Sequence, residues 1–266
     1  MHTQYSPTVA KLLTIGDAHN QEWPNYLDLG LRAEHIPELI SLATDAKLFW
    51  SESEGREVWA PIHAWRTLGQ LRATEAIEPL IPMFHELEDS DWSGEELPEV
   101  FGMIGREAIP ALARYLSDTT HVMWPRLTAA HALERIAAND PSARAEVMAA
   151  LTQPLEQYAT NDPELNAFLI SYLIDIKAVE AAPLMERIFA DDRAELSIQG
   201  DWEDVQIALG LRTERETPRP RYNLFPPLEL PIAPAGKSKS SAGKAAAKAK
   251  SKRKQSKASR KKNKRK

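Results

Sequence analysis

The sequence predicts an all-α protein, an α-solenoid of stacked antiparallel helix pairs, and three observations favour this class. Apolar residues recur every three or four positions, as at Ile36, Leu39, Ile40 and Ala43, which is the period of an amphipathic helix. No stretch of four to eight β-branched residues alternates with polar ones as a strand would. Similar segments recur at intervals of 30–40 residues, a period typical of repeats that contain two helices each.

Ten amphipathic helices are expected between Glu34 and Gly210, after an N-terminal segment of residues 1–33. Two starts are marked by the pairs Asp140-Pro141 and Asp162-Pro163. In each pair the aspartate caps free N–H groups, and proline fits the first helical position because it has no N–H to leave unpaired. The helices are expected at 34–46, 57–71, 74–88, 95–104, 106–117, 125–138, 141–158, 163–176, 178–190 and 202–210.

The repeats are clearest in the segments Leu68–Leu80, Phe101–Leu112 and Leu173–Leu184. Each segment ends one helix, turns, and opens the next helix with Glu-Ala and a proline ahead of a leucine. The three prolines, Pro79, Pro110 and Pro183, are separated by 31 and 73 residues, and a weaker copy at 131–140 fills the longer interval. Because one helix pair cannot bury its apolar face alone, the pairs are expected to stack from residue 34 to residue 212.

The segment Ala60–Ile81 resembles a HEAT-like repeat of the short phycobilisome-lyase type, and the similarity covers about residues 57–190. The resemblance implies stacked HEAT-like helix pairs. It implies little about activity, because the family includes chromophore lyases, hydroxylases and binding scaffolds. A helical bundle without repeats is the alternative fold.

Charge divides the chain into an acidic body and a basic tail. The 15 Lys and Arg residues of 237–266 occur without any Asp or Glu, whereas the preceding 236 residues have a formal net charge of −20. Between them, residues 213–236 form a proline-rich, extended strap that also carries Tyr222, Leu224 and Phe225. The strap is expected to lie back on the last helix of the body; a docking motif for another protein is the alternative.

The tail is expected to be disordered and to bind a polyanion such as nucleic acid, because it supplies positive charge without aromatic residues for base stacking. Two alternatives stay open: the tail contacts the acidic body, or it serves only solubility. The candidate polyanion-binding residues are Lys252, Arg253, Lys254, Arg260, Lys261 and Lys262.

The sequence favours neither a metal site nor a cofactor. Deoxyhypusine hydroxylases of the resembled family use several His-Glu pairs, and His85-Glu86 is the only such pair here. The lone histidines His63 and His131 are interpreted as packing or capping residues.

A weak calcium-loop candidate comprises Asp89, Asp91, Ser93 and Glu99, followed at the sixth position by Gly94. In that candidate Glu99 falls one place before the position of the bidentate glutamate. The alternative is a capping box in which Ser93 is the N-cap of a helix and pairs with Glu96.

Catalytic motifs are not found. The chain has no cysteine, which excludes thiolate nucleophiles and cysteine-ligated metals. No G-x-S-x-G, P-loop or G-x-G-x-x-G motif occurs. An enzyme is therefore not the favoured reading.

Tryptophans cluster in the N-terminal half of the chain, at Trp50, Trp59, Trp65, Trp92 and Trp124. Exposed tryptophans on a repeat surface anchor partners, although a tryptophan at helical spacing from core residues is more often buried. The predicted partner-binding residues are Trp92, Trp59 and Trp65, with the acidic neighbours Glu88 and Asp91.

These observations predict a non-catalytic adaptor whose repeat surface binds a protein or peptide and whose tail tethers it to a polyanion. The alternative is a phycobilisome-lyase-like enzyme or cofactor-handling protein with its site in the concave groove. A cytoplasmic location is expected, because neither a secretory signal nor a run of 18 apolar residues is found in the sequence.

Overall fold

The computed structural model describes residues 5–19, 22–51, 55–88 and 90–219, whose regular secondary structure is entirely helical. The all-α prediction is therefore confirmed for this part of the chain. The α-helices are α1 (Leu12–Ile15), α2 (Ile36–Ala43), α3 (Ala46–Phe49), α4 (Ala60–Gln70), α5 (Ile77–Leu80), α6 (Met83–Glu86), α7 (Asp91–Ile104), α8 (Ile109–Ser117), α9 (Met123–Asn139), α10 (Arg144–Leu155), α11 (Pro163–Asp175), α12 (Ala182–Ala190), α13 (Leu196–Gln199) and α14 (Trp202–Ala208).

Short 3₁₀ helices directly precede seven of the 14 described α-helices. The sequence predicts continuous α-helices over several of these regions. In the structure the first turn of such a helix is a 3₁₀ turn, which is wound more tightly than an α-helical turn. They are η1 (Val9–Lys11), η2 (Tyr26–Leu29), η3 (Ala33–His35), η4 (Arg56–Trp59), η5 (Thr74–Ala76), η6 (Arg106–Ala108), η7 (Pro141–Ala143) and η8 (Val179–Ala181).

The caps predicted at residues 140 and 162 are both present. The Asp140 carboxylate accepts a hydrogen bond from the Ser142 N–H at 3.0 Å, and the Asp162 carboxylate accepts one from the Glu164 N–H at 2.8 Å. Each satisfies an N–H group that has no partner within the helix.

The continuous helix expected at 74–88 is wrong. The structure has η5, α5 and α6 there, with a break before Met83. Pro82 lies at this break, and proline has no N–H to continue the helical hydrogen bonding and clashes with the preceding turn.

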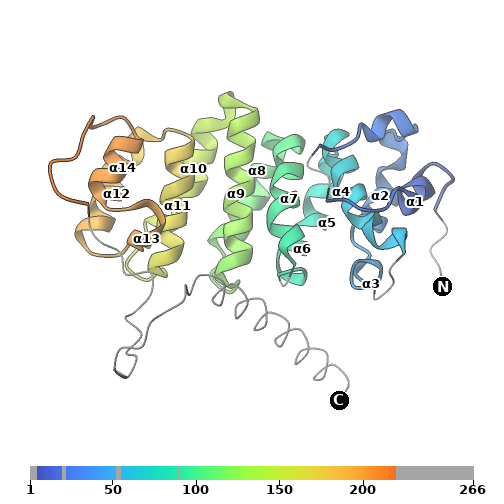
Figure 1. Ribbon diagram of the computed structural model, residues 1–266, viewed down its shortest axis with the longest axis horizontal. Helices are drawn as coiled ribbons and strands as arrows, with labels where there is room; N and C mark the ends of the chain where they lie inside the picture. Colours follow the sequence, from blue (N-terminus) through green and yellow to red (C-terminus); the bar gives the residue numbers. More distant parts are fainter. Residues whose placement is uncertain (1–4, 20–21, 52–54, 89, 220–266) are drawn as a thin grey trace, which may run out of the picture. The chain divides into compact units, whose positions relative to one another are not determined.

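The helices form two sets of neighbours. The first set contains α4, α7, α9 and α11, in which each helix packs against the next, and Figure 1 shows α7, α9 and α11 side by side. Helices α8 and α10 form the second set: α8 contacts α9 and α10, and α10 also contacts α9 and α11. The sequence order α7, α8, α9, α10, α11 therefore alternates between the two sets.

Polar contacts repeat along the chain at one spacing. Five pairs of described residues that are 36 positions apart are joined by side-chain hydrogen bonds. This spacing lies within the period of 30–40 residues that the sequence predicts. The pairs are Glu78–Arg114, Glu99–Arg135, Arg106–Ser142, Ser117–Gln153 and Arg144–Glu180.

The turns repeat as well. After α4, Ala73 N–H donates to Leu68 O and Arg72 N–H donates to Gly69 O, and the same pair of bonds follows α11 at Leu173–Ala178. Arg72 and its counterpart Lys177 both have positive φ, at 52° and 54°. These are the hydrogen bonds of a Schellman cap, which satisfies free carbonyls at the end of a helix.

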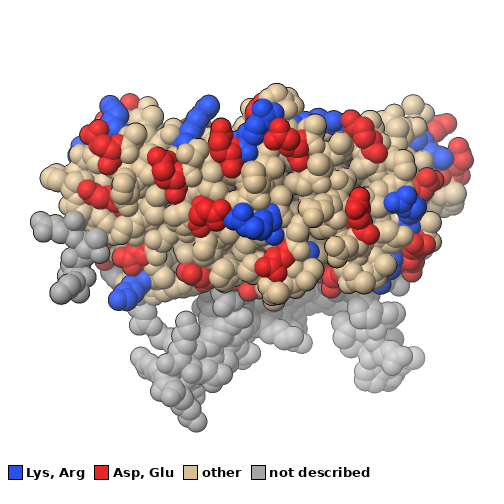
Figure 2. Space-filling view, turned by 180° about the vertical axis from the view of Figure 1, so that it is seen from behind, with Lys and Arg blue, Asp and Glu red and all other residues tan. Residues whose placement is uncertain are grey.

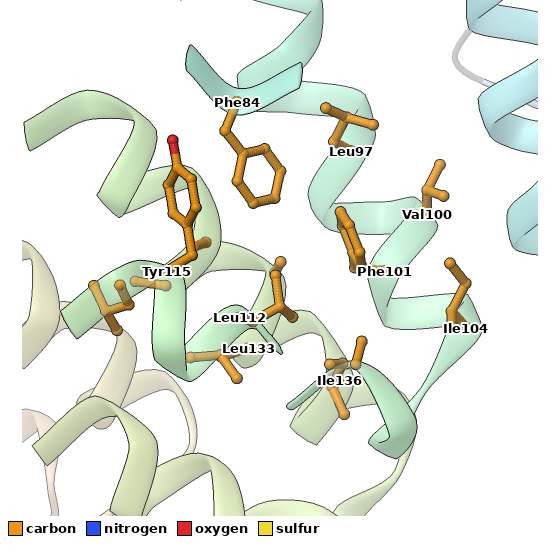
Figure 3. Packing of buried hydrophobic residues seen from close by; sticks show 14 of the residues in the cluster. Phe84, Leu97, Val100, Phe101, Ile104, Leu112, Tyr115, Leu133 and Ile136 are labelled. Carbon is orange, nitrogen blue, oxygen red and sulfur yellow. The ribbon is translucent and has the colours of Figure 1, made fainter. Parts of the chain in front are cut away.

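A continuous hydrophobic core runs between the helices from Val9 to Leu209. In its middle, Phe84 of α6 packs against Phe101 of α7 and Tyr115 of α8, with ring centroids 5.5 and 5.4 Å apart (Figure 3). Leu133 and Ile136 of α9 complete this part of the core. Residues of α6, α7, α8 and α9 therefore share one continuous core.

The described residues of the N-terminal segment, 5–19 and 22–33, contribute to this core, which was not predicted from the sequence. The buried apolar residues of this segment are Val9, Leu12, Ala18, Tyr26 and Leu31, and α1 packs against η4 and α4. At the other end, Arg215 pairs with Asp201 and Asp204 at the start of α14. Residues 213–219 of the predicted strap therefore lie against the last helix, and 220–236 lie outside the described residues.

Candidate binding groove

A groove of about 450 Å³ lies over the N-terminal part of α7 and the neighbouring faces of α9 and α11. Its aromatic side chains come from three helices: Phe84 from α6, Trp124 and His131 from α9, and Phe168 and Tyr172 from α11. Ring contacts pair the aromatic residues of α9 with those of α11. The Trp124 and Phe168 rings meet edge to face with centroids 5.8 Å apart, and the His131 and Tyr172 rings stack at 5.7 Å.

Trp124 is the most exposed aromatic residue of the groove, with 53% of its surface accessible. It lies at the second position of α9, next to Val122, which is 55% exposed. An exposed tryptophan beside partly buried aromatic rings is the arrangement of an interface anchor.

The α7 side of the groove depends on where that helix begins. The helix starts at Asp91 with Ser90 as its N-cap, whose hydroxyl accepts a hydrogen bond from Trp92 N–H at 3.3 Å. The predicted start at residue 95 with Ser93 as N-cap is therefore wrong. Ser93 is buried, and its hydroxyl lies 3.0 Å from Leu87 O and 3.1 Å from Ser90 O.

Pro98 lies inside α7 and leaves one carbonyl of this helix without its usual partner. A proline inside a helix leaves the carbonyl four residues earlier without its usual N–H partner, which here is the carbonyl of Gly94. The Gly94 carbonyl instead faces His131, and this contact favours the protonated imidazole. Burial is the larger influence and keeps the pKa of His131 below its ordinary value.

Two carboxylates line the groove, and Lys and Arg are absent from the described residues that line it. Glu88 and Glu95 are exposed at the rim. Burial raises the pKa of Glu134 on α9 and of Asp175 on α11. Burial, together with these two carboxylates, raises the pKa of the Tyr172 phenol to about 12. The groove therefore presents aromatic faces and negative charge, a combination that attracts organic cations.

Two of the predicted tryptophan anchors lie outside this groove and pack together. Trp59 and Trp92 contact each other and His19, with ring centroids 4.9–5.5 Å apart, and both are partly buried. The prediction for Trp65 is wrong: it has no exposed surface, and its indole N–H donates to Ala43 O at 2.7 Å.

Of the two predicted acidic neighbours, Glu88 does line the groove, whereas nothing is described of the Asp91 side chain. Phe168 and Tyr172 were not predicted from the sequence as partner-binding residues. The available signal is that α11 carries apolar residues on more of its circumference than one core-facing stripe requires, which indicates neighbours on two sides.

The remaining predicted residues, two histidines and six basic residues, lie outside the groove or outside the described ranges. His63 is a packing residue, as predicted: it is buried, its Nε2–H donates to Gly16 O at 2.7 Å, and its Nδ1 accepts from the Tyr26 hydroxyl at 2.6 Å. The ring of His85 stacks on Tyr115, with Nδ1 3.1 Å from its hydroxyl oxygen. The six basic residues predicted to bind a polyanion all lie outside the described ranges.

The four residues of the calcium-loop candidate have separate outcomes in the structure. Asp89 lies outside the described residues, and the Asp91 side chain is not described. The Ser93 hydroxyl donates a hydrogen bond to the Leu87 carbonyl of the same chain. Glu99 forms an ion pair with Arg135 at 2.8 Å. In the described ranges, His, Asp and Glu do not gather in groups of three that could hold a metal ion.

A second hollow, of about 890 Å³, lies at the C-terminal ends of α4, α7 and α9. Asn139, Arg72 and Arg106 line it, and Arg106 already donates to Ser142 O at 2.8 Å. It contains no tryptophan, phenylalanine or tyrosine. We therefore regard the aromatic groove as the better candidate for a binding site.

Charges of both signs are mixed on the face seen in Figure 2, where acidic and basic groups are interspersed among other described residues. None of the described helices is both long and apolar enough to span a bilayer.

Comparison with family models, with curated proteins and with solved structures finds no match. The described part of the chain is thus defined by its all-helical fold and by its acidic, aromatic-lined groove. Its function has to be inferred from these residues.

Proposed function

We propose that this protein is a non-catalytic scaffold of the HEAT-like repeat type that binds a protein or peptide segment in the aromatic groove and is tethered to a polyanion by its tail. The exposed Trp124 beside Phe168 in an acidic groove is the observation that carries the proposal. The alternation of helices between two sets and the contacts at 36-residue spacing support a repeat architecture.

The groove is tested by capturing a partner on immobilised full-length protein, purifying that partner and measuring its affinity by calorimetry. Trp124→Ala should weaken binding at least tenfold, because a central tryptophan anchor contributes about 2 kcal/mol or more. Trp50→Ala is the matched control: Trp50 is 47% exposed and lies at the end of α3, outside the groove. Equal losses in the two variants would contradict the proposal.

The tail is tested with the full-length chain and a variant in which Lys252, Arg253, Lys254, Arg260, Lys261 and Lys262 are replaced by glutamine. Anisotropy of a labelled DNA duplex is measured across a salt series. The variant should bind more weakly, and its log–log salt slope should be smaller by up to about 5. Replacing tail serines by alanine is the control. Unchanged affinity in the glutamine variant would contradict the tether.

The cofactor-handling alternative has a distinct signature. A protein that holds a tetrapyrrole should show a visible absorption band when purified, whereas the scaffold should purify colourless. A bound pigment whose spectrum changes in Trp124→Ala would assign the groove to the cofactor instead.

A further inference from the structure

The aromatic groove contains two carboxylates that have no cation beside them. Glu88 and Glu95 are exposed at its rim, and neither has an ion-pair partner among the described residues. Two further carboxylates, those of Glu134 and Asp175, act on the titration of Tyr172, which also lines the groove. The groove therefore has a negative potential that a bound cation would offset.

The spacing of polar contacts along the chain places rings beside these two carboxylates. Three glutamates each pair with an arginine 36 positions away, namely Glu78, Glu99 and Glu180. The positions 36 residues after Glu88 and Glu95 hold Trp124 and His131, which line the same groove. Burial lowers the pKa of His131 below its ordinary value, so its imidazole is neutral at pH 7. A ligand can therefore supply the cation that the other three glutamates find in the chain.

Among protein side chains, arginine fits these rings and carboxylates best. Its guanidinium is planar, stacks on aromatic faces and has N–H donors in a fork that matches a carboxylate. Trp124 keeps 53% of its surface exposed although its ring meets Phe168 edge to face. Much of this indole is thus open to a stacked guanidinium. A lysine ammonium is a point charge that pairs with a carboxylate but cannot stack as a plane.

The fold already contains an arginine between a tryptophan and a glutamate. The guanidinium of Arg66 lies 5.0 Å from the ring centroid of Trp23 and donates to both carboxylate oxygens of Glu96. The groove has the tryptophan and the carboxylates of that arrangement, whereas its described lining residues include no guanidinium. This comparison favours arginine as the missing component.

The surroundings of the groove favour an arginine that is carried by a longer segment. The groove volume of about 450 Å³ lies within the range of about 300–1,000 Å³ that is typical of ligand sites. Val122, which precedes α9 close to Trp124, is 55% exposed. A small guanidinium compound would leave this valine in water, whereas the neighbouring residues of a peptide can cover it.

We propose that the groove binds an arginine side chain of a partner protein, with the guanidinium stacked on Trp124 and its charge balanced by Glu88 and Glu95. Apolar residues that flank this arginine in the partner contact Val122. The inference rests on the groove being the binding site of the proposed function, and it adds the chemistry of the partner segment.

Three probes separate charge from shape on the full-length chain. They are Nα-acetyl-arginine amide, the corresponding lysine amide and the citrulline amide, which is neutral and nearly isosteric with arginine. Binding is followed through the tryptophan indole N–H signals in nitrogen-15 NMR spectra, and the Trp124 signal is the one that Trp124→Phe removes. We expect the arginine amide to shift this signal saturably and to bind about fivefold or more tighter than the citrulline amide.

The lysine amide should bind more weakly than the arginine amide. No shift of the Trp124 signal, or equal binding of the arginine and citrulline amides, would overturn the proposal. Lysine amide that binds as tightly as arginine amide would overturn the assignment to arginine.

Substitutions of the rim carboxylates test the charge contribution. Glu88→Gln combined with Glu95→Gln should remove most of the preference for the arginine amide over the citrulline amide. Glu75→Gln combined with Glu156→Gln is the matched control, because these two glutamates are also exposed and lie outside the groove. Equal effects of the two double variants would show that only the overall charge of the protein matters, and would overturn the site.

A displayed library of random peptides tests the partner segment. Peptides are selected on the full-length protein, and those that also bind Trp124→Ala are removed. We expect the remaining peptides to share an arginine next to apolar residues. Citrulline in place of that arginine should weaken binding of a synthetic peptide about tenfold or more in calorimetry.

The outcomes of the selection separate this inference from the proposed function. If the remaining peptides bind without arginine, the groove stands as a binding site and only the chemistry of its partner is wrong. If no selected peptide depends on Trp124, the groove is not the binding site, and the proposed function and this inference both fail.

Discussion

The guanidinium of Arg66 and the carboxylate of Glu96 form a two-pronged ion pair inside the protein. Arg66 Nε donates to one carboxylate oxygen at 2.7 Å and Nη2 to the other at 2.6 Å, and the two side chains are 2% and 11% exposed. The pair joins α4 to α7. Nη2 also donates to Ala18 O at 2.8 Å, and the guanidinium lies 5.0 Å from the ring centroid of Trp23. Arg66 thus also holds the N-terminal segment against the helices, beside the core contacts of that segment.

Removing one partner of this pair should be far more costly than replacing both. Glu96→Gln or Arg66→Met leaves an uncompensated buried charge or unpaired groups, and we expect each to lower the free energy of unfolding by about 3–5 kcal/mol. Arg66→Met combined with Glu96→Leu should lose less than the sum of the two single variants. Urea unfolding monitored by circular dichroism measures this coupling. Additive losses would show that the pair does not act as a unit.

His63 should make stability fall as the pH drops below about 7. Burial lowers its pKa below the ordinary value of 6.5, although the Gly16 carbonyl and Glu96 act in the opposite direction. The folded state therefore resists protonation that the unfolded chain accepts. Stability from this group is complete above about pH 6.5 and is lost as the pH falls towards the folded pKa.

The slope should reach at most about 1.4 kcal/mol per pH unit for this one histidine. Urea unfolding at several pH values measures it, and His63→Gln should reduce the slope whatever its effect on stability at pH 7. His131→Gln is the comparison, because burial also lowers the pKa of His131. A slope that is unchanged in His63→Gln would contradict this assignment.

The sequence predicts the helical class and many helix positions because the physical signals are local. Asp140 and Asp162 mark helix starts through capping, and both carry the expected hydrogen bonds. The solenoid of HEAT-like repeats stays a prediction, supported by the contacts at 36-residue spacing.

What the sequence did not predict depends on contacts between distant residues. The residues next to Trp65 in the sequence give no signal that its indole N–H will donate to the Ala43 carbonyl. The residues next to Tyr26 likewise give no signal that its hydroxyl will form a hydrogen bond with His63. The start of α7 was misplaced because Ser93 and Glu96 fit a local capping box, whereas Ser90 is the N-cap and the buried Ser93 hydroxyl donates to Leu87 O. The groove, likewise, exists only where α9 and α11 bring Trp124 and Phe168 together.

Two glycines of α7 should respond in opposite ways to alanine. A Cβ at Gly102 would lie 2.9 Å from Arg135 Cβ and 3.3 Å from the Arg135 backbone, because α7 and α9 approach closely there. Gly102→Ala should therefore cost about 1–3 kcal/mol through overpacking. A Cβ at Gly94 meets nothing within 4 Å, so Gly94→Ala should stabilise the protein by up to about 1 kcal/mol through helix propensity. Thermal unfolding compares the two, and a shift in the same direction for both would contradict the close packing.

Arg144 and Arg114 both pair with a glutamate 36 positions away, yet their replacement should differ in effect. Arg114 contacts only Glu78, and both side chains are about two-thirds exposed. Arg144 pairs with Glu180 through two bonds of 3.0 and 2.8 Å and also donates to the carbonyls of Ile176 and Lys177 at the end of α11. Its bonds lower the pKa of Glu180 to about 2.

Arg144→Ala should therefore lower the free energy of unfolding by about 1–3 kcal/mol, because it leaves helix-terminal carbonyls without donors. Arg114→Ala should cost less than about 1 kcal/mol, as exposed ion pairs do. Arg144→Lys should recover only part of the loss, since an ammonium cannot form the planar two-pronged contact. Urea unfolding at pH 7 in low and high salt distinguishes these effects. The carbonyl contribution should persist in high salt, and a loss in Arg144→Ala that salt abolishes would show that the ion pair alone accounts for it.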